Sequence, residues 1–160
     1  MVGVNCSAAS RAAVLWAAHE ARLRHDVLLV THIDLPTAYA PEIYDAATAC
    51  HRVLVECATL ASDAEPSIAV GTVLLTGGIS AELIRLSQSA DLLVVGIGQD
   101  DPSSAPGLLY TIGDRVLLKA HCPVVLVPEP TGSAVTVAGR ELHLAIPKLP
   151  GSELLPVGGS

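Results

Sequence analysis

The sequence is poor in aromatic side chains. Aromatic residues make up 2% of its 160 residues, with one Trp and no Phe, whereas hydrophobic residues make up 51%. The hydrophobic core must therefore be aliphatic, which suits layered α/β packing of Ala-rich helices against Val- and Leu-rich strands. The length allows one domain with a substantial core and a tail, and is short for two domains.

Long apolar runs and clustered basic residues are also missing. No apolar run approaches the roughly 18 to 20 residues that span a membrane, and the amino terminus lacks the charged-then-apolar pattern of a signal peptide. The nine Lys and Arg are scattered among 16 Asp and Glu, for a net charge of -7, so a nucleic-acid backbone would find no basic surface. We expect a cytoplasmic protein that binds neither membranes nor nucleic acid.

The four cysteines, Cys6, Cys50, Cys57 and Cys122, form no Cys-x-x-Cys pair. This argues against a zinc site and against a secreted disulfide framework, and favours cysteines that act as small buried hydrophobic residues. Cys6 keeps a second interpretation, because it precedes a predicted helix, and the positive end of a helix dipole favours a thiolate. A redox sensor at Cys6 therefore stays an alternative to an inert thiol.

The stretch from Ala90 to Pro128 organises the chain. Asp91 to Val95 is a short β-branched run typical of a strand covered on both faces, and residues 97–106 have a turn composition. From Leu108 onward, apolar residues recur at helical spacing until Pro123. Val124 to Val127 then forms a second buried strand, which completes a βαβ unit.

Three more strands and three more helices precede this unit. The expected strands cover residues 1–4, 27–33 and 67–75, and the expected helices cover residues 7–24, 42–64 and 80–89. Ser7 and Ser80 are the expected N-caps of the first and third helices. Five buried strands that alternate with four helices predict an α/β fold with a doubly wound, five-stranded parallel sheet and helices on both faces.

The helix faces follow from the spacing of apolar residues. On the first helix, the expected apolar stripe consists of Ala12, Leu15, Trp16, His19 and Leu23. On the second helix, Cys50 and Cys57 are expected to share a buried face with Val53 and Leu54, while His51 and Arg52 are expected on its exposed side.

The chain resembles the universal stress proteins. The resemblance rests on Asp91 to Gly96, on Arg115-Val-Leu followed by Ala120 to Val124, and on the Gly- and Ser-containing loop between them. It covers residues 2–127, about four fifths of the chain. It implies a sheet order of 3-2-1-4-5, a domain at residues 1–130 and an extension at residues 131–160. It also implies a homodimer through the strand Val124 to Val127, because an apolar edge strand promotes aggregation unless another strand pairs with it or covers it.

The phosphate loop departs from the family pattern. In the ATP-binding branch of the family it reads G-x-x-G, followed further on by Gly and then Ser or Thr. In this sequence Gly96 and the hydroxyl of Thr111 survive, the second glycine is displaced to Gly98, and Tyr110 replaces the third. Asp100 and Asp101 add negative charge to a loop that would hold an anion. We therefore expect weak or lost ATP binding, with ATP or AMP as the cofactors that the resemblance leaves open.

The adenine side departs as well. The family usually has Asp-Gly-Ser after the first strand, whereas this chain has Asn5-Cys6-Ser7. The carboxyl end of the second strand would border the same crevice at Ile33. The candidate cofactor-binding residues are Asn5, Cys6, Ser7, Ile33, Gly96, Gly98 and Thr111.

No catalytic or metal-binding residue is assigned. His32 and Asp34 stand on alternate positions and could share a metal, but two ligands do not make a metal site. Cys6 with His32, or Ser7 with Asp34, would lie near the crevice without resembling a known catalytic signature. We expect a binding and regulatory module with an unknown protein partner. The alternative is an ATP- or AMP-binding sensor of the same family with slow hydrolysis.

The extension after Pro128 has two open interpretations. Residues 134–146 alternate apolar and polar positions on both sides of Ala138-Gly139, which suits a β-hairpin as well as a disordered extension. A hairpin that folded back could cover the edge strand within one chain, in place of the dimer. Residues 149–160 are expected to be mobile.

Overall fold

A computed structural model describes residues 1–35, 46–98, 111–129, 136–137 and 140–141. Five parallel strands form one sheet in the order β3-β2-β1-β4-β5. The strands are β1 (Val2–Val4), β2 (Leu28–Asp34), β3 (Val70–Thr76), β4 (Leu93–Ile97) and β5 (Val124–Pro128). The predicted doubly wound sheet and its order are confirmed.

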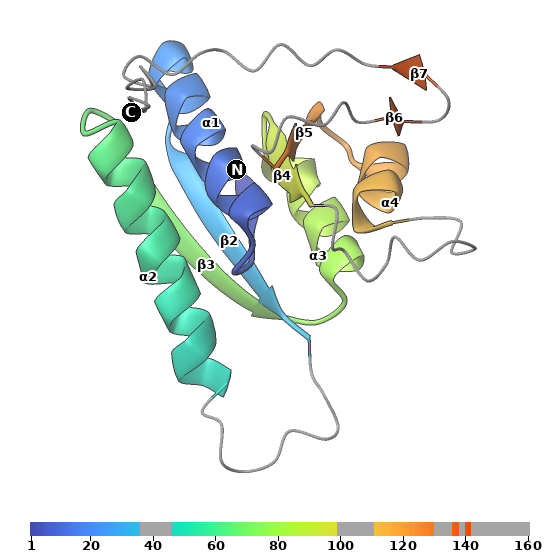
Figure 1. Cartoon of the computed structure of the whole chain (residues 1–160), viewed down its shortest axis with the longest axis horizontal. Helices are drawn as coiled ribbons and strands as arrows, with labels where there is room; N and C mark the ends of the chain where they lie inside the picture. The colour runs from blue at the N-terminus through green and yellow to red at the C-terminus, as the bar shows by residue number, and fades with distance from the viewer. Residues whose placement is uncertain (36–45, 99–110, 130–135, 138–139, 142–160) are drawn as a thin grey trace, which may run out of the picture.

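Two pairs of helices cover the two faces of the sheet (Figure 1). Two long helices, α1 (Ala8–Arg24) and α2 (Ala46–Ala64), pack on one face. Two short helices, α3 (Ile79–Leu86) and α4 (Ile112–Lys119), pack on the other face. A 3-10 turn at Ser87–Ser89 extends α3. No helix in these described ranges combines the length and the apolar character that crossing a membrane requires.

Helix α1 buries its small residues. Its buried positions are Ala9, Ser10, Ala13, Val14, Ala17, Ala18 and Ala21. The expected stripe of larger residues is wrong: Leu23 is 56% exposed, and the other four are only partly buried. The larger side chains are displaced because α1 approaches the sheet so closely that only small side chains fit between them.

The closest approach is at Gly96 of β4. A Cβ atom on this residue would lie 2.4 Å from the backbone carbon and oxygen of Ala9 in α1. No real Cβ tolerates such a contact with backbone atoms, so glycine is required for the helix to sit against the strand. Gly96 therefore has a packing role in addition to the ligand role that the sequence suggests.

Helix α2 follows its expected pattern. Cys50, Val53, Leu54 and Cys57 are each less than 10% exposed, and His51 and Arg52 face outward. The residues from 36 to 45, which include the expected start of this helix, lie outside the described residues.

The short helices begin elsewhere than expected. Helix α3 begins at Ile79 with Gly78 as its N-cap and no side-chain cap bond, so the assignment of Ser80 as N-cap is wrong. Helix α4 begins at Ile112, and Thr111 has an extended backbone and is its N-cap, so the expected start at Leu108 is wrong as well. Apolar spacing locates a helix but not the residue whose side chain caps its first turn.

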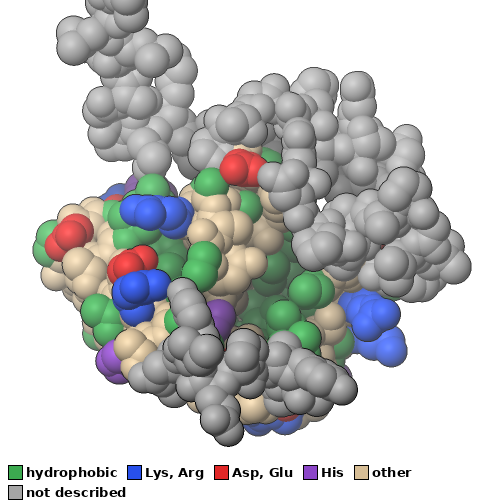
Figure 2. All heavy atoms as spheres, turned by 60° about the horizontal axis from the view of Figure 1, so that its bottom comes forward, with side chains coloured by type: hydrophobic (Ala, Val, Ile, Leu, Met, Phe, Trp, Pro, Cys, Tyr) green, Lys and Arg blue, Asp and Glu red, His purple; other side chains and the backbone are tan. Residues whose placement is uncertain are grey.

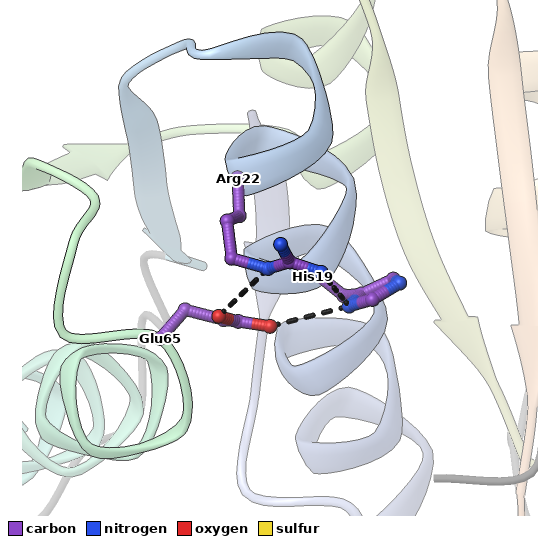
Figure 3. A network of polar contacts seen from close by, with 3 residues as sticks. All are labelled: His19, Arg22 and Glu65. Carbon is purple, nitrogen blue, oxygen red and sulfur yellow. Dashed lines mark hydrogen bonds and ion pairs between the residues drawn. The ribbon is translucent and has the colours of Figure 1, made fainter. Parts of the chain in front are cut away.

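An ion-pair network joins the last turns of α1 to the end of α2 (Figure 3). Glu65 Oε2 lies 2.9 Å from Arg22 Nε, and Glu65 Oε1 lies 3.2 Å from His19 Nδ1. Burial by itself would raise the pKa of the Glu65 carboxyl, but hydrogen bonds from His19 and Arg22 hold this pKa below its usual value. Helix α1 is thus fixed at both ends, at Ala9 by packing and at its last turns by charge.

Two short strands follow the sheet. β6 (Thr136–Val137) and β7 (Arg140–Glu141) pair antiparallel, so the hairpin interpretation is supported over these four residues. Neither strand joins the main sheet, and β5 forms one edge of that sheet. Among the described residues, no strand pairs with the outer edge of β5.

Candidate functional site

The carboxyl ends of β1, β2 and β4 meet where the strand order reverses. β1 lies between β2 and β4, and the chain leaves β1 toward one face of the sheet and β4 toward the other. Open parallel sheets bind ligands in the crevice at this point. Figure 2 brings this end of the molecule forward; the described side chains near its centre are mostly uncharged, with basic and acidic side chains on the left, an acidic one above the centre and basic ones on the right.

Side-chain hydrogen bonds close the turn between β1 and α1. Asn5 Oδ1 accepts from the Ser7 backbone N–H at 2.9 Å and from the Ser10 hydroxyl at 2.7 Å. The Ser10 Oγ accepts from the Asn5 N–H at 2.9 Å, and the Ser7 Oγ caps α1 by accepting from the Ser10 N–H at 3.1 Å. Ser7 is confirmed as the N-cap. The Asn5 side-chain oxygen therefore already accepts two hydrogen bonds within its own turn.

Gly98 follows β4 and lies next to a carboxylate. A Cβ placed on Gly98 would be 3.7 Å from Glu129 Oε2 and 3.9 Å from the Ala9 Cβ, which are ordinary contacts. Glu129 is held there because its backbone N–H donates to the Ile97 carbonyl at 3.1 Å. A negative charge thus stands beside the displaced second glycine of the loop.

The start of α4 forms a capping box. Thr111 Oγ1 accepts from the Asp114 N–H at 3.1 Å and donates to Asp114 Oδ2 at 3.0 Å, while Asp114 Oδ2 also accepts from the Thr111 N–H at 3.0 Å. These bonds stabilise the first turn of the helix. The Thr111 hydroxyl, which this chain shares with the family's loop, therefore already forms hydrogen bonds with Asp114.

The end of β2 contributes one oriented and one buried side chain. His32 Nδ1 donates to the Val4 carbonyl at 2.8 Å, which fixes that ring nitrogen as the protonated one. Ile33 is 7% exposed and packs in the hydrophobic cluster with Leu83 and Val95, so its side chain belongs to the core. In the described part of the chain, no three His, Cys, Asp or Glu side chains form a group that could hold a metal.

The cysteines divide into two groups. Cys50 and Cys57 are buried as expected, and burial is the main cause that raises the pKa of each thiol. Cys122 is half-buried and its pKa is raised by burial as well. Cys6 is exposed, so the expectation of a buried residue is wrong there. The cause is that Cys6 belongs to the turn before α1, not to the helix face.

The structure brings most of the predicted site together and adds three residues. Asn5, Cys6 and Ser7 follow β1, and Gly96 and Gly98 lie at the end of β4 against the first turn of α1. The residues that sequence reasoning missed are Ser10, Asp114 and Glu129. The spacing Thr111-x-x-Asp114 is a capping signal that points to Asp114. Ser10 is found only from its hydrogen bonds with Asn5, and Glu129 only from the register of β4 with β5.

A cavity lies at the other end of the sheet. It has a volume of about 250 Å³ and is lined by residues such as Met1, Arg24, Leu28 and Ala90, next to the amino ends of β1, β2 and β4. We assign the candidate site to the crevice at the carboxyl ends, because strand order and helix starts both favour ligands there.

The model of the universal stress protein family matches residues 1–128. The chain belongs to this family. Universal stress protein Rv2624c of Mycobacterium tuberculosis (strain ATCC 25618 / H37Rv) is 29% identical over 131 residues, which cover 79% of this chain and 47% of that protein. This universal stress protein chain therefore spans about half the length of the curated relatives it matches. The family's name links its members to the stress response, and at this level the link holds for the chain.

Solved universal stress proteins share the fold. A crystal structure of a universal stress protein in complex with cAMP has a TM-score of 0.63 and 22% identity, and covers 80% of this chain and 94% of its own. The structure of the universal stress protein from Archaeoglobus fulgidus in complex with dAMP has a TM-score of 0.62 and 19% identity, and covers 79% of this chain and 94% of its own. At these identities the likeness concerns the fold.

Proposed function

We propose that this universal stress protein is a binding and regulatory module and not an enzyme, and that its crevice binds adenine nucleotides weakly and favours monophosphates over ATP. The two similar structures with cAMP and dAMP support an adenine monophosphate as the ligand class. The proposal includes a cytoplasmic location and a protein partner whose identity is open, both as the sequence predicts.

The observation that carries the preference is the carboxylate of Glu129 beside Gly98. A phosphate cradle works because backbone amides point at anionic oxygens, and a carboxylate within a few ångström opposes each added phosphate charge. The Thr111 hydroxyl already donates to Asp114 Oδ2 within its own turn. A triphosphate would have to break this bond or do without it.

The size of the effect follows from hydrogen-bond energies. A hydrogen bond to a charged group contributes about 1.5 to 3 kcal/mol. Loss of two such bonds weakens binding by roughly two to four orders of magnitude, because about 1.4 kcal/mol corresponds to a factor of ten. A micromolar ATP site would then become roughly millimolar, while a ligand with one phosphate would lose less.

Calorimetry with ATP and AMP tests this proposal. We expect AMP to bind more tightly than ATP, and both Glu129→Gln and Tyr110→Gly to improve ATP binding by about tenfold or more, from the charge and hydrogen-bond terms above. Glu20→Gln is the matched control, because Glu20 lines the cavity at the opposite end of the sheet. Low-micromolar ATP binding by the natural protein would instead support the alternative, an ATP sensor with slow hydrolysis.

The proposal also covers assembly. We propose that residues 1–130 form the domain and that it dimerises through β5, whose outer edge pairs with no strand of the described residues and runs beside partly buried Val124, Val125 and Leu126. Helix α4, which packs on β5, exposes 70% of Leu118. Sedimentation at micromolar concentration, with and without residues 131–160, should give a dimer in both cases. A monomer in both contradicts the dimer, and a dimer only without the extension indicates that the extension covers β5.

A further inference from the structure

A small cavity separates the turn before α1 from the middle of α2. Its volume is about 70 Å³, and its lining includes Cys6, Arg11, Glu56 and Cys57. Cys6 comes from the exposed turn and Cys57 from the buried face of α2, where it is 5% exposed. Two thiols from distant parts of the sequence thus line one cavity, with a guanidinium beside them.

We propose that Cys6 and Cys57 form a redox-active dithiol site that hydroperoxides oxidise to a disulfide across this cavity. The site shares Cys6 with the candidate crevice, but its oxidation does not require a bound nucleotide, so the two proposals can be tested separately.

The exposure of the two thiols assigns their roles. Cys6 is exposed and is the thiol that a hydroperoxide in solution can reach. Cys57 is buried, and burial raises the pKa of its thiol, while the nearby Arg11 guanidinium lowers it in part. Cys57 is therefore protected from direct oxidation, and Arg11 can stabilise the Cys57 thiolate at the moment it reacts.

The chemistry is a two-electron oxidation in two steps. The Cys6 thiolate attacks one peroxide oxygen, so that an S–O bond forms, the O–O bond breaks, and the other oxygen leaves as an alcohol or water after taking a proton. The Cys57 sulfur then attacks the Cys6 sulfur, so that the S–S bond forms, the S–O bond breaks, and the hydroxyl leaves as water with the Cys57 proton. The two thiols supply both electrons, and the hydroperoxide receives them.

Cys50 is the competing partner and provides the control. It is also buried on α2, and it lies close enough to Cys6 that a Cys6 thiolate would raise the pKa of the Cys50 thiol. However, it is not among the lining residues of the cavity, and burial together with the Asp34 carboxylate raises the pKa of its thiol. Both effects disfavour the Cys50 thiolate, whereas at Cys57 the Arg11 guanidinium lowers the pKa by more than the Glu56 carboxylate raises it.

The test is peptide mapping of the natural protein after treatment with one equivalent of hydrogen peroxide. The protein is alkylated under native conditions before it is unfolded and digested without reductant, so that thiols cannot exchange. We expect two of the four thiols to be lost, and a peptide pair that joins Cys6 to Cys57. This measurement needs no variant, so it holds even if a substitution disturbs folding.

Three variants sharpen the assignment. Cys50→Ser should give the same linked peptides as the natural protein, and Cys6→Ser should give none. Cys57→Ser should leave Cys6 as a sulfenic acid that dimedone traps. A Cys6 to Cys50 link, a Cys6 to Cys6 link between chains, or four unreacted thiols in the natural protein would overturn the proposal.

Discussion

The two helix starts that border the crevice are built alike but are anchored differently. At both starts, polar side chains bond within the turn: Asn5, Ser7 and Ser10 before α1, and Thr111 with Asp114 before α4. Only the first start is also pressed against the sheet, because the backbone of Ala9 lies against Gly96. The start of α4 has a contact of ordinary length with the sheet, since a Cβ on Gly113 would be 3.5 Å from Ile97 Cγ2.

This difference indicates how a perturbation would spread. A change at the start of α1 must move a 17-residue helix that packs against β1, β2, β4 and β5, and so should lower the stability of the whole domain. A change at the start of α4 acts on an eight-residue helix with local cap bonds, and so should loosen that helix alone. The second helix start is thus better suited to adapt to different ligands.

The largest expected effect comes from Gly96→Ala. The added methyl would lie 2.4 Å from backbone atoms of Ala9, and backbone atoms cannot rotate away as a side chain can. We expect a loss of about 3 kcal/mol or more in the free energy of unfolding, at the upper end of overpacking effects, measured by urea denaturation.

Gly113→Ala is the matched control for this substitution. Gly113 is buried and Gly96 is partly buried, but an added methyl at Gly113 meets its neighbours at 3.5 Å or more, and alanine favours the helix. The control should stay within about 1 kcal/mol of the natural protein. Equal losses at the two glycines would contradict the proposed difference between the helix starts.

The second effect is that of Ser10→Ala. The Ser10 side chain is buried, and its hydroxyl both accepts from the Asn5 N–H and donates to Asn5 Oδ1, so the substitution leaves the Asn5 N–H without its partner and removes one of the two hydrogen bonds to Asn5 Oδ1. We expect a loss of about 2 kcal/mol, again by urea denaturation. Ser7→Ala removes the single cap bond and should cost about 1 kcal/mol. If Ser7→Ala proved the more damaging, the Asn5–Ser10 bonds would not be what closes this turn.

The sequence predicts the sheet and the helix layers, because buried strands and alternating helices leave few topologies, and the family resemblance implies the strand order. It mispredicts the face of α1 for a physical reason. Counting large apolar residues assigned Leu23 to the core, yet Leu23 is 56% exposed and the core face is alanine. What decides the face is the distance of closest approach at Gly96, and a periodicity contains no such distance.

The candidate site is predicted in part for a similar reason. Asn5, Ser7 and Gly98 are brought to one end of the sheet by strand order alone, which the sequence predicts. The roles of Ser10 and Glu129 depend on side-chain placement across the turn and across β4 and β5. Tyr110, Asp100 and Asp101 lie outside the described residues, so their effect on phosphate binding stays a prediction.

The third effect, that of Thr111→Ala, should be local. It removes the capping box of α4 and should cost about 1 kcal/mol in the stability of that helix. Hydrogen exchange can separate a local change from a global one. We expect faster exchange of the α4 amides and unchanged exchange in α1, with Thr111→Ser restoring protection. Faster exchange in both helices would show that the two starts are coupled after all.

The smallest expected effect is that of Glu65→Gln, at the other end of α1. Glu65 joins α1 to the end of α2 through Arg22 and His19, and its side chain is 19% exposed (Figure 3). Its pKa in the folded protein is lowered, so the ionised carboxylate stabilises the fold above its unfolded pKa of about 4.3, and this contribution disappears as the pH falls through the folded value.

The midpoint of thermal unfolding, measured at neutral pH and at a pH of about 3, tests this anchor of α1. Glu65→Gln should lower the midpoint at neutral pH, and the difference from the natural protein should shrink as the pH falls and the Glu65 carboxylate takes up its proton. Glu20→Gln is the matched control, because the Glu20 pair with Arg24 lies within α1 and joins no second element. A midpoint difference for Glu65→Gln that did not change with pH would mean that shape, and not charge, fixes this end of the helix. In that case the close packing at Gly96 would be the main anchor that distinguishes α1 from α4.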